Sequence, residues 1–259
     1  MSERRTIELV REGFPRPAGM DTAVSRAILS RVSDGQLPES LRLHRPASIV
    51  AFGPKDRLAP GFADAVGAAA AHGFSSVHRL AGGRAAVFHE ETIAFSWAIP
   101  SENARTGITE RFDEVAAIMV EAFRSLGVDA RVGEVPGEYC PGAHSVNARG
   151  ARKVMGVGQR IVRRAAHVGG VVVVGGSKRI RDVLVPVYAA LGLAWDPETV
   201  GSLEDEVPGV TWDEAEGAVI DALSVRFDLR PATVDAGVLA LAATLRHDAE
   251  VAPPVGAGA

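Results

Sequence analysis

The sequence predicts an α/β (α+β) fold in which sheets that are rich in hairpins are flanked by helices. Short β-prone runs separated by Gly and Pro fill residues 41–97 and 132–174. Stretches with apolar residues at helical spacing precede, separate and follow these two regions. With 259 residues, 47% of them hydrophobic, the chain can bury a sizeable core within one domain.

The first half of the chain is expected to hold two helices and a set of short strands. Asp21 is a candidate N-cap for a helix that ends at Asp34-Gly35, and Pro60 opens a second helix that runs to Gly73. Gly82-Gly83 separates two of the strands. The strands are expected at residues 41–43, 48–52, 77–80, 85–89 and 92–97.

The second half is expected to alternate hairpins with helices. Thr109 starts an amphipathic helix that Gly127 stops, and later helices are predicted from Ser177, from the capping box at Thr211 and from Pro231 to about His247. Strands are predicted at residues 132–135, 145–148, 154–162 and 167–174. Residues 1–248 are therefore predicted to form one domain, with helices alone beyond about 205, and residues 249–259 a disordered tail.

Composition excludes several classes of protein. A net charge of −4 argues against nucleic-acid binding, and the longest apolar run, at residues 171–174, is far too short to span a bilayer. The N-terminus lacks an apolar signal core, so we expect a soluble, cytoplasmic protein. The single cysteine excludes an internal disulfide, and Cys140 with His144 offers too few ligands for a structural metal.

Cys140 is the first candidate for chemistry. It lies in Glu138-Tyr-Cys-Pro-Gly, thirteen residues before Lys153. A free thiol has a pKa near ~8.5, so a thiolate at neutral pH needs a cationic neighbour, and a lysine can supply one. A buried structural thiol is the usual role of a lone cysteine. The Pro-Gly that follows favours an exposed turn instead.

Gly82-Gly83, between two predicted strands, is the second candidate. Without a Cβ, these residues let the backbone approach a ligand closely and offer free N–H groups to a carbonyl or phosphate. An ordinary hairpin turn is the competing interpretation.

Together these segments resemble the lipoate-protein ligase and octanoyltransferase family, which shares a fold with biotin ligases. The ligases carry Arg-Arg-x-Ser-Gly-Gly-Gly-x-Val-x-His, and Lys153 and Gly156 fall on the family's Lys-x-x-Gly motif. The resemblance covers roughly residues 20–200 and implies mixed, largely antiparallel sheets flanked by helices. The residues that match the longer motif are Arg79, Gly82, Gly83, Val87 and His89.

The departures from the ligase pattern favour one branch of the family. Arg84 replaces the third glycine, His78 replaces the first arginine, and one extra residue precedes Val87. These changes argue against adenylate formation. Glu-Tyr-Cys-Pro-Gly and Arg-Lys-Val-Met-Gly are similar to the cysteine-dependent octanoyl amidotransferases.

The resemblance implies a ping-pong acyl transfer without a cofactor. The Cys140 thiolate would take an octanoyl or lipoyl group, and a lysine of a lipoyl domain or H protein would then attack the thioester. By the same resemblance, Lys153 orients the acyl carbonyl, Arg79 holds the loop, and Gly82-Gly83 lines the acyl tunnel. His89 is either a base for the incoming amine or a structural histidine.

The expected partners are lipoyl domains of 2-oxoacid dehydrogenases, the glycine cleavage H protein and acyl carrier protein. Between Arg149 and Arg164 the chain has six cations and no acid, which is either a docking rim for acidic carriers or a solvated hairpin face. Two other functions stay open. One is an ATP-dependent lipoate ligase in which Cys140 is incidental, and the other is a non-catalytic binding protein for lipoylated or acyl-carrier partners.

Overall fold

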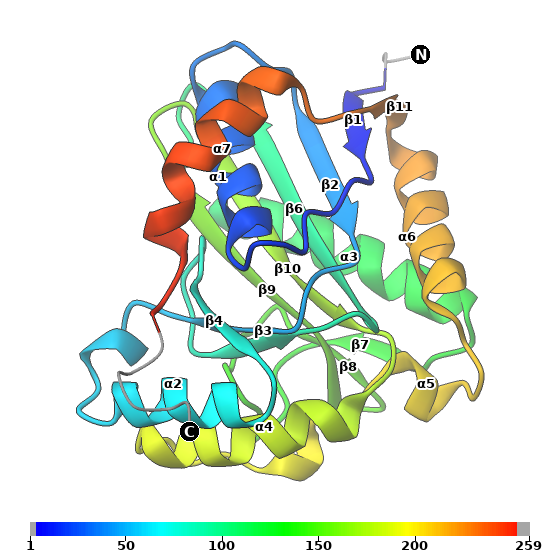
Figure 1. Ribbon diagram of the computed structural model, residues 1–259. Coiled ribbons are helices and arrows are strands. Elements are labelled where there is room, and N and C mark those ends of the chain that lie inside the picture. The colour runs from blue at the N-terminus through cyan, green and yellow to red at the C-terminus, as the bar shows by residue number, and fades with distance from the viewer. Residues whose placement is uncertain (1–3, 253–259) are drawn as a thin grey trace.

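Two β-sheets form the centre of the computed structural model, which describes residues 4–252 (Figure 1). The larger, eight-stranded sheet has the order β11-β1-β2-β6-β10-β9-β8-β7, and the smaller has the order β4-β3-β5. The strands are β1 (Thr6–Val10), β2 (Ser40–His44), β3 (Ile49–Phe52), β4 (Ser75–His78), β5 (Ala86–Phe88), β6 (Thr92–Pro100), β7 (Ala130–Val132), β8 (Val146–Ala148), β9 (Arg152–Ile161), β10 (Ala165–Val173) and β11 (Asp228–Ala232).

The sheets are mixed and largely antiparallel, as the sequence predicted. In the larger sheet, β1 runs parallel to β2 and β11, and the remaining neighbours are antiparallel. In the smaller sheet, β3 is parallel to β4 and antiparallel to β5. The long antiparallel ladder of β6, β10 and β9 is the part of the larger sheet closest to the functional residues.

Helices cover both faces of the larger sheet and the outer face of the smaller one (Figure 1). On one face α1 packs against α7, on the other α3 packs against α6, and α2 and α4 lie beneath the smaller sheet. The helices are α1 (Met20–Ser33), α2 (Phe62–Ala71), α3 (Ile108–Ser125), α4 (Ser177–Ala190), α5 (Leu203–Glu206), α6 (Trp212–Arg226) and α7 (Ala236–Ala249), with short 3-10 helices η1 (Asp56–Leu58) and η2 (Pro197–Thr199).

Strand β6 explains how one sheet serves two cores. Side chains alternate across a strand, so Phe95 and Trp97 face α3 and α6, whereas Ala98 faces α1. The small side chain of Ala98 lets α1 pack close to the sheet. The N-terminal turn of α1 is thereby placed beside the strands that carry the functional residues.

The C-terminal region differs from the prediction of helices alone. Pro231 does not start a helix but lies in β11, an edge strand where its missing N–H is tolerated. The last helix starts later, because the Asp235 side chain accepts a hydrogen bond from the Val238 N–H at 2.7 Å and caps α7. Strand β1, at residues 6–10, was missed as well.

Two further boundaries are corrected. Gly19, not Asp21, is the N-cap residue of α1, and the Asp21 carboxylate binds the buried Arg42 instead. The predicted tail does not start at residue 249, because Glu250 bridges to Val77 and the Val251 N–H donates to Ser76 O at 3.1 Å. The rest of that predicted tail, residues 253–259, lies outside the described residues.

Across residues 4–252, none of the helices combines the length and the apolar character that crossing a bilayer requires.

Glu39 gives a pH-dependent test of the packing around Trp97. The Glu39 carboxylate accepts a hydrogen bond from Trp97 Nε1 at 2.8 Å, and burial raises its pKa from 4.5 to about 7. A carboxyl whose pKa is raised by folding stabilises the protein below its unfolded pKa and loses that contribution as the pH rises through the folded pKa. The melting temperature of Glu39→Gln, minus that of the wild type, should therefore increase from pH 5 to pH 8. The same substitution at the exposed Glu102 should show no such trend, and a flat difference for Glu39→Gln would contradict the assignment.

Candidate active site

Cys140 lies in the loop between β7 and β8, and the loop that joins β4 to β5 closes over it. The Cys140 Sγ accepts hydrogen bonds from Arg79 Nη1 at 3.1 Å and from the Arg84 backbone N–H at 3.2 Å. Arg79 Nη1 also donates to Arg84 O at 2.6 Å. The glycine-rich segment and the cysteine segment, 56 to 61 residues apart, therefore meet at the sulfur atom.

The backbone of Cys140 is held in a conformation that is rare for this residue type. Its φ is +43°, in the left-handed region, which costs a non-glycine residue about 1–2 kcal/mol. The Cys140 N–H donates to Tyr188 Oη at 2.9 Å, and Lys153 Nζ donates to Cys140 O at 2.8 Å. Tyr188 Oη in turn donates to Ala85 O at 2.9 Å. Helix α4 and strand β9 thus fix the backbone, and the side chain stays directed at Arg79.

Glu138 forms the centre of the cysteine loop. Its Oε1 accepts hydrogen bonds from Lys153 Nζ at 3.0 Å, Ser145 Oγ at 2.8 Å and the Gly142 N–H at 3.1 Å. Its Oε2 accepts from the Val135 N–H at 3.0 Å. Both side chains of the Glu138–Lys153 pair are almost fully buried, so the ion pair is interior to the protein.

The environment of the thiol favours its ionised form. Burial alone would raise the pKa of Cys140, but the charges of Arg79 and Lys153 and the hydrogen bonds from Arg79 and the Arg84 N–H outweigh burial. The net effect is a pKa below the ordinary value of a cysteine. A lower thiol pKa increases the fraction of the group that is present as thiolate, which is the nucleophilic form.

The two glycines of the closing loop differ in what they contact. Gly83 has φ +113°, and a Cβ built there would lie 2.6 Å from Arg79 Nη1 and 2.9 Å from Cys140 Sγ. A Cβ at Gly82 would meet nothing within 4 Å. Gly83 is therefore needed for the close approach of the loop to the sulfur, whereas a side chain at Gly82 would have open space around it.

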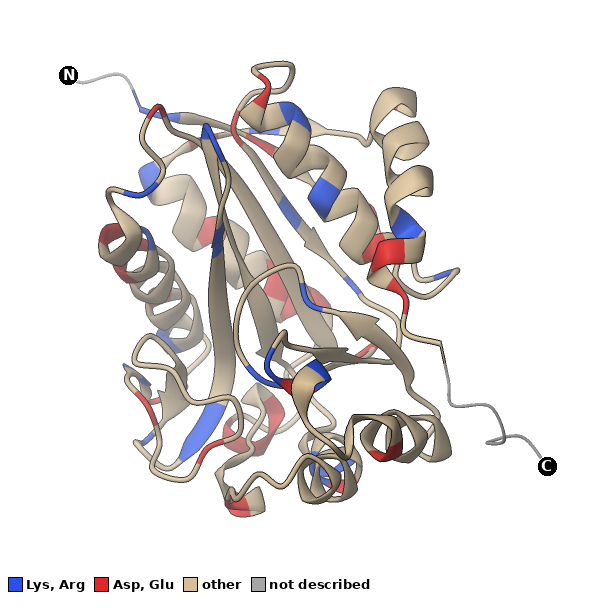
Figure 2. Cartoon of the chain, turned by 90° about the vertical axis from the view of Figure 1, so that its left-hand side faces the viewer, with Lys and Arg blue, Asp and Glu red and all other residues tan. Residues whose placement is uncertain are grey.

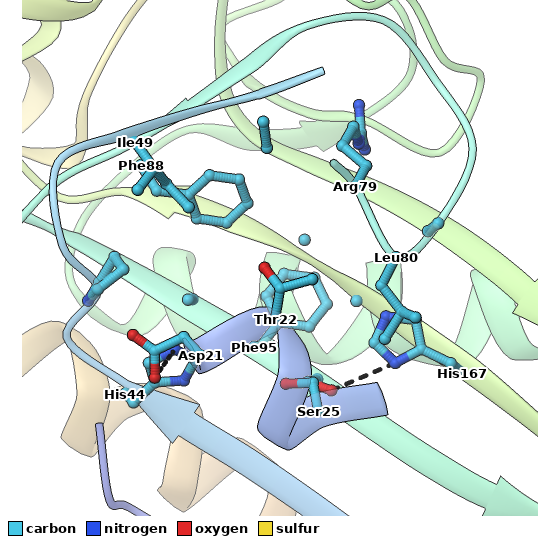
Figure 3. Close-up of a pocket in the computed structure, with 17 residues that line it drawn as sticks. Asp21, Thr22, Ser25, His44, Ile49, Arg79, Leu80, Phe88, Phe95 and His167 are labelled. Carbon is cyan, nitrogen blue, oxygen red and sulfur yellow. Dashed lines mark hydrogen bonds and ion pairs between the residues drawn. The ribbon is translucent and has the colours of Figure 1, made fainter. Parts of the chain in front are cut away.

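Cys140 lines a small cavity that lies next to a larger one. The small cavity is also lined by Lys153 and Gly156, and it shares Arg79, Phe88 and Gly170 with the larger cavity. Figure 3 shows Ile49 and Phe88 on one side of the larger cavity, Arg79 near its upper end and the first turn of α1 opposite. Its apolar lining residues are Ile49, Ala51, Leu80, Ala81, Phe88, Ala94 and Phe95.

Two buried histidines add polar atoms to the lining of the larger cavity and lie on opposite sides of it (Figure 3). His167 Nδ1 lies 3.2 Å from Ser96 Oγ, and burial lowers the pKa of His167 to about 3 (Figure 3). His44 Nε2 lies 3.3 Å from an oxygen of Asp21, and burial lowers the pKa of His44 to about 3 as well. Cys140 and the predominantly apolar lining of the larger cavity are thus neighbours, because the two cavities share Arg79, Phe88 and Gly170.

A family model matches most of the chain. The model of the lipoyl protein ligase A/B catalytic domain matches residues 17–224. The chain belongs to this family.

Proteins similar to this chain include a transferase and ligases of known structure. The octanoyl-[GcvH]:protein N-octanoyltransferase of Exiguobacterium sp. strain AT1b is 26% identical over 166 residues, so the chain spans 59% of the length of that relative. The structure of lipoate-protein ligase A bound with ATP superposes with a TM-score of 0.71 at 21% identity, covering 95% of this chain and 94% of that chain. The bi-partite lipoate protein ligase of Thermoplasma acidophilum, studied with its E2 lipoyl domain, gives 0.71 at 21% identity, covering 95% and 93%. At these identities the two structures establish the shared fold.

His89 matches the family motif but is not brought to Cys140. It is fully buried in the turn between β5 and β6, lines neither cavity, and its Nδ1 accepts a hydrogen bond from the Glu91 N–H at 3.3 Å. Burial lowers its pKa to about 4, so the ring is neutral. This placement favours the structural role over that of a base for the incoming amine.

The basic run from Arg149 to Arg164 does not form one rim. Lys153 points into the interior, and Arg149 pairs with Glu206 at 2.7 Å. Arg163 and Arg164 lie at the opposite end of β9, a strand of ten residues, which places about 30 Å between the two ends. Figure 2 shows Lys and Arg interspersed with Asp and Glu across the face in view. The docking rim proposed from the sequence is therefore wrong as a continuous surface.

The sequence analysis predicted one site that contains Arg79, Gly83, Cys140, Lys153 and Gly156. It missed other members of that site. Glu138 stands two residues before Cys140, and its place in the cysteine segment was the signal that could have found it. Tyr188 and the Arg84 N–H carry no local signal, because their partners are 48 and 56 residues away.

The contrast between the two glycines is testable. Gly83→Ala places a Cβ against Cys140 Sγ and Arg79 at a strained φ, so the loop must move, and the rate of Cys140 alkylation at pH 7 should change by about tenfold or more, equivalent to ~1.4 kcal/mol. Gly82→Ala is the matched control and should leave the rate near that of the wild type. Equal effects of the two substitutions would contradict the geometry.

Proposed function

We propose that this protein is an acyltransferase that moves an octanoyl or lipoyl group through a Cys140 thioester to the lysine of a lipoyl domain or H protein. The observation that carries the proposal is the Cys140 Sγ, held by Arg79 and the Arg84 N–H beside a largely apolar cavity. The relative described as an octanoyl-[GcvH]:protein N-octanoyltransferase supports the same class of reaction.

The cavity provides for both parts of an acyl thioester. The hydrocarbon chain would lie between Phe88 and Phe95, and its carbonyl carbon would meet Sγ at the junction with Arg79. Burial of the hydrocarbon chain in an apolar cavity favours binding by roughly 0.8 kcal/mol for each methylene group.

An ATP-dependent lipoate ligase is the second candidate, because ligases have the same fold. Against it, the Arg84 N–H is engaged with Sγ, and the Arg84 side chain pairs with the buried Asp56 at 3.2 Å. A ligase also has no need of a cysteine whose pKa is lowered. A non-catalytic binding protein, the third candidate, leaves that activated thiol unexplained.

The acyl donor and acceptor follow from the same proposal. Lipoyl domains and the H protein are the proposed acceptors, and acyl carrier protein or an already acylated H protein is the proposed donor. Two observations support these partners. The Exiguobacterium transferase is named for its octanoyl-[GcvH] substrate, and the Thermoplasma acidophilum ligase was studied with its E2 lipoyl domain. A cytoplasmic location, without a cofactor, is part of the proposal.

Intact-mass spectrometry tests the covalent step. After incubation with octanoyl-carrier protein, the wild type should gain the mass of one octanoyl group, and neutral hydroxylamine should remove it because the bond is a thioester. Cys140→Ser should show no hydroxylamine-sensitive gain and should lose octanoyl transfer to a lipoyl domain by at least ~10³-fold, since the nucleophile is removed. Octanoylation that needs ATP and free octanoate, and that persists in Cys140→Ser, would overturn the proposal in favour of a ligase.

A further inference from the structure

Lys153, the lysine of the family motif, has no N–H left for an acyl group. An ammonium has three N–H donors. In this structure Lys153 Nζ has three acceptors within hydrogen-bond distance, Glu138 Oε1 at 3.0 Å, Tyr139 O at 3.1 Å and Cys140 O at 2.8 Å. All three belong to the cysteine loop. Binding an acyl carbonyl would require the lysine to release one of them.

The positive charge of Lys153 is neutralised by a carboxylate, in addition to its N–H groups being fully engaged. The Glu138 carboxylate lies 3.0 Å from Nζ, and both side chains are withdrawn from water. Such a pair acts on a third group largely as a dipole, whose effect falls off faster than that of a lone charge. The sulfur of Cys140 therefore gains less from Lys153 than an unpaired lysine would give.

Arg79 differs from Lys153 both in its hydrogen bonds and in its charge. Its Nη1 contacts Sγ directly at 3.1 Å, and Arg79 forms no ion pair with any carboxylate in residues 4–252. Its second contact, with Arg84 O, is to a neutral carbonyl. Arg79 therefore brings an uncompensated positive charge to the sulfur.

Resting on the proposed acyl transfer, we propose that Arg79 is a catalytic residue that stabilises the Cys140 thiolate, and that Lys153 with Glu138 is a positioning pair that holds the cysteine backbone. The family resemblance implied the opposite assignment, in which Lys153 orients the acyl carbonyl of the substrate and Arg79 holds the loop.

The reaction uses the thiolate twice. The Cys140 thiolate attacks the carbonyl carbon of the donor thioester, a bond from carbon to Sγ forms, and the donor sulfur leaves with its electron pair and takes a proton from water. The acceptor amine then attacks the acyl-enzyme, a C–N bond forms, Sγ leaves with the electron pair, and the amine proton passes to solvent. A cation against Sγ favours both steps, because it stabilises the thiolate as nucleophile and as leaving group.

The test measures the pKa of the single thiol from the pH dependence of its alkylation by iodoacetamide. Arg79→Met should raise that pKa by about one unit or more, because an opposite charge in contact lowers a pKa by ~1–3 units. Arg79→Lys should recover part of the shift. The double variant Lys153→Met/Glu138→Gln, which removes the pair without a change of net charge, should shift the pKa less than Arg79→Met while lowering the melting temperature.

Arg160→Met is the matched control, since the exposed Arg160 contacts Leu80 O in the same loop at 3.4 Å without touching the sulfur. It should leave the thiol pKa unchanged. The proposal is overturned if Arg79→Met leaves the pKa unchanged, or if the double variant raises it more than Arg79→Met does. If the double variant does not fold, the comparison of Arg79→Lys with Arg79→Met decides, and equal pKa values overturn the proposal.

This outcome is separable from that of acyl transfer. The alkylation assay contains no acyl donor, so a raised pKa in Arg79→Met supports the role of Arg79 whether or not Cys140 accepts an octanoyl group. Conversely, acylation of Cys140 with an unshifted pKa in Arg79→Met would support the proposed function and overturn the role of Arg79.

Discussion

The ion pair between Glu138 and Lys153 is the interaction on which the candidate site depends. Both side chains are buried, and the Glu138 carboxylate accepts four hydrogen bonds, three of them from within the cysteine loop. Loss of one partner of a buried pair typically costs about 3–5 kcal/mol, because the other charge is left uncompensated. The buried side chain of Tyr139 anchors the same loop in the hydrophobic core. The pair therefore supplies the order that a left-handed cysteine backbone requires.

The pair also transmits the rigidity of the sheet to the sulfur. Lys153 lies at the start of β9, which is hydrogen-bonded to β8 on one side and β10 on the other. From there its Nζ reaches the carbonyl of Cys140, while Tyr188 of α4 holds the Cys140 N–H and the carbonyl of Ala85. Each of these contacts is made to backbone atoms. The side chain of Cys140 consequently remains available to Arg79 and to a substrate.

The parts of the fold that the sequence predicted are those with strong local periodicity. Strands β6, β9 and β10 and helix α3 carry apolar side chains at the spacing of a strand or a helix, and their positions were predicted closely. Strand β11 pairs with β1 across more than two hundred residues and is largely exposed, so its sequence lacks the pattern of a buried strand. Its pairing is set by tertiary contacts.

The site was predictable to a similar degree. Cys140, Lys153, Arg79 and Gly83 could be associated through motifs, but the partners of each polar atom could not, because a motif does not show which acceptors surround Nζ. His89 illustrates the opposite error. It fits a motif position, yet the turn between β5 and β6 directs its ring into a buried environment away from both cavities.

The closing loop gives a physical reason why one fold can serve two chemistries. Asp56 binds the Gly53 N–H at 2.8 Å and the Arg84 guanidinium at 3.2 Å, and a Cβ at Gly53 would lie 1.7 Å from Gly83 O. The loop between β4 and β5 is therefore held against η1, and the Arg84 N–H is directed at Cys140 Sγ. A backbone N–H can stabilise a nucleotide phosphate or a thiolate, but a single N–H does not serve both at once. In this chain the Arg84 N–H is used on sulfur, which supports the proposed acyl transfer through a thioester over activation through an adenylate.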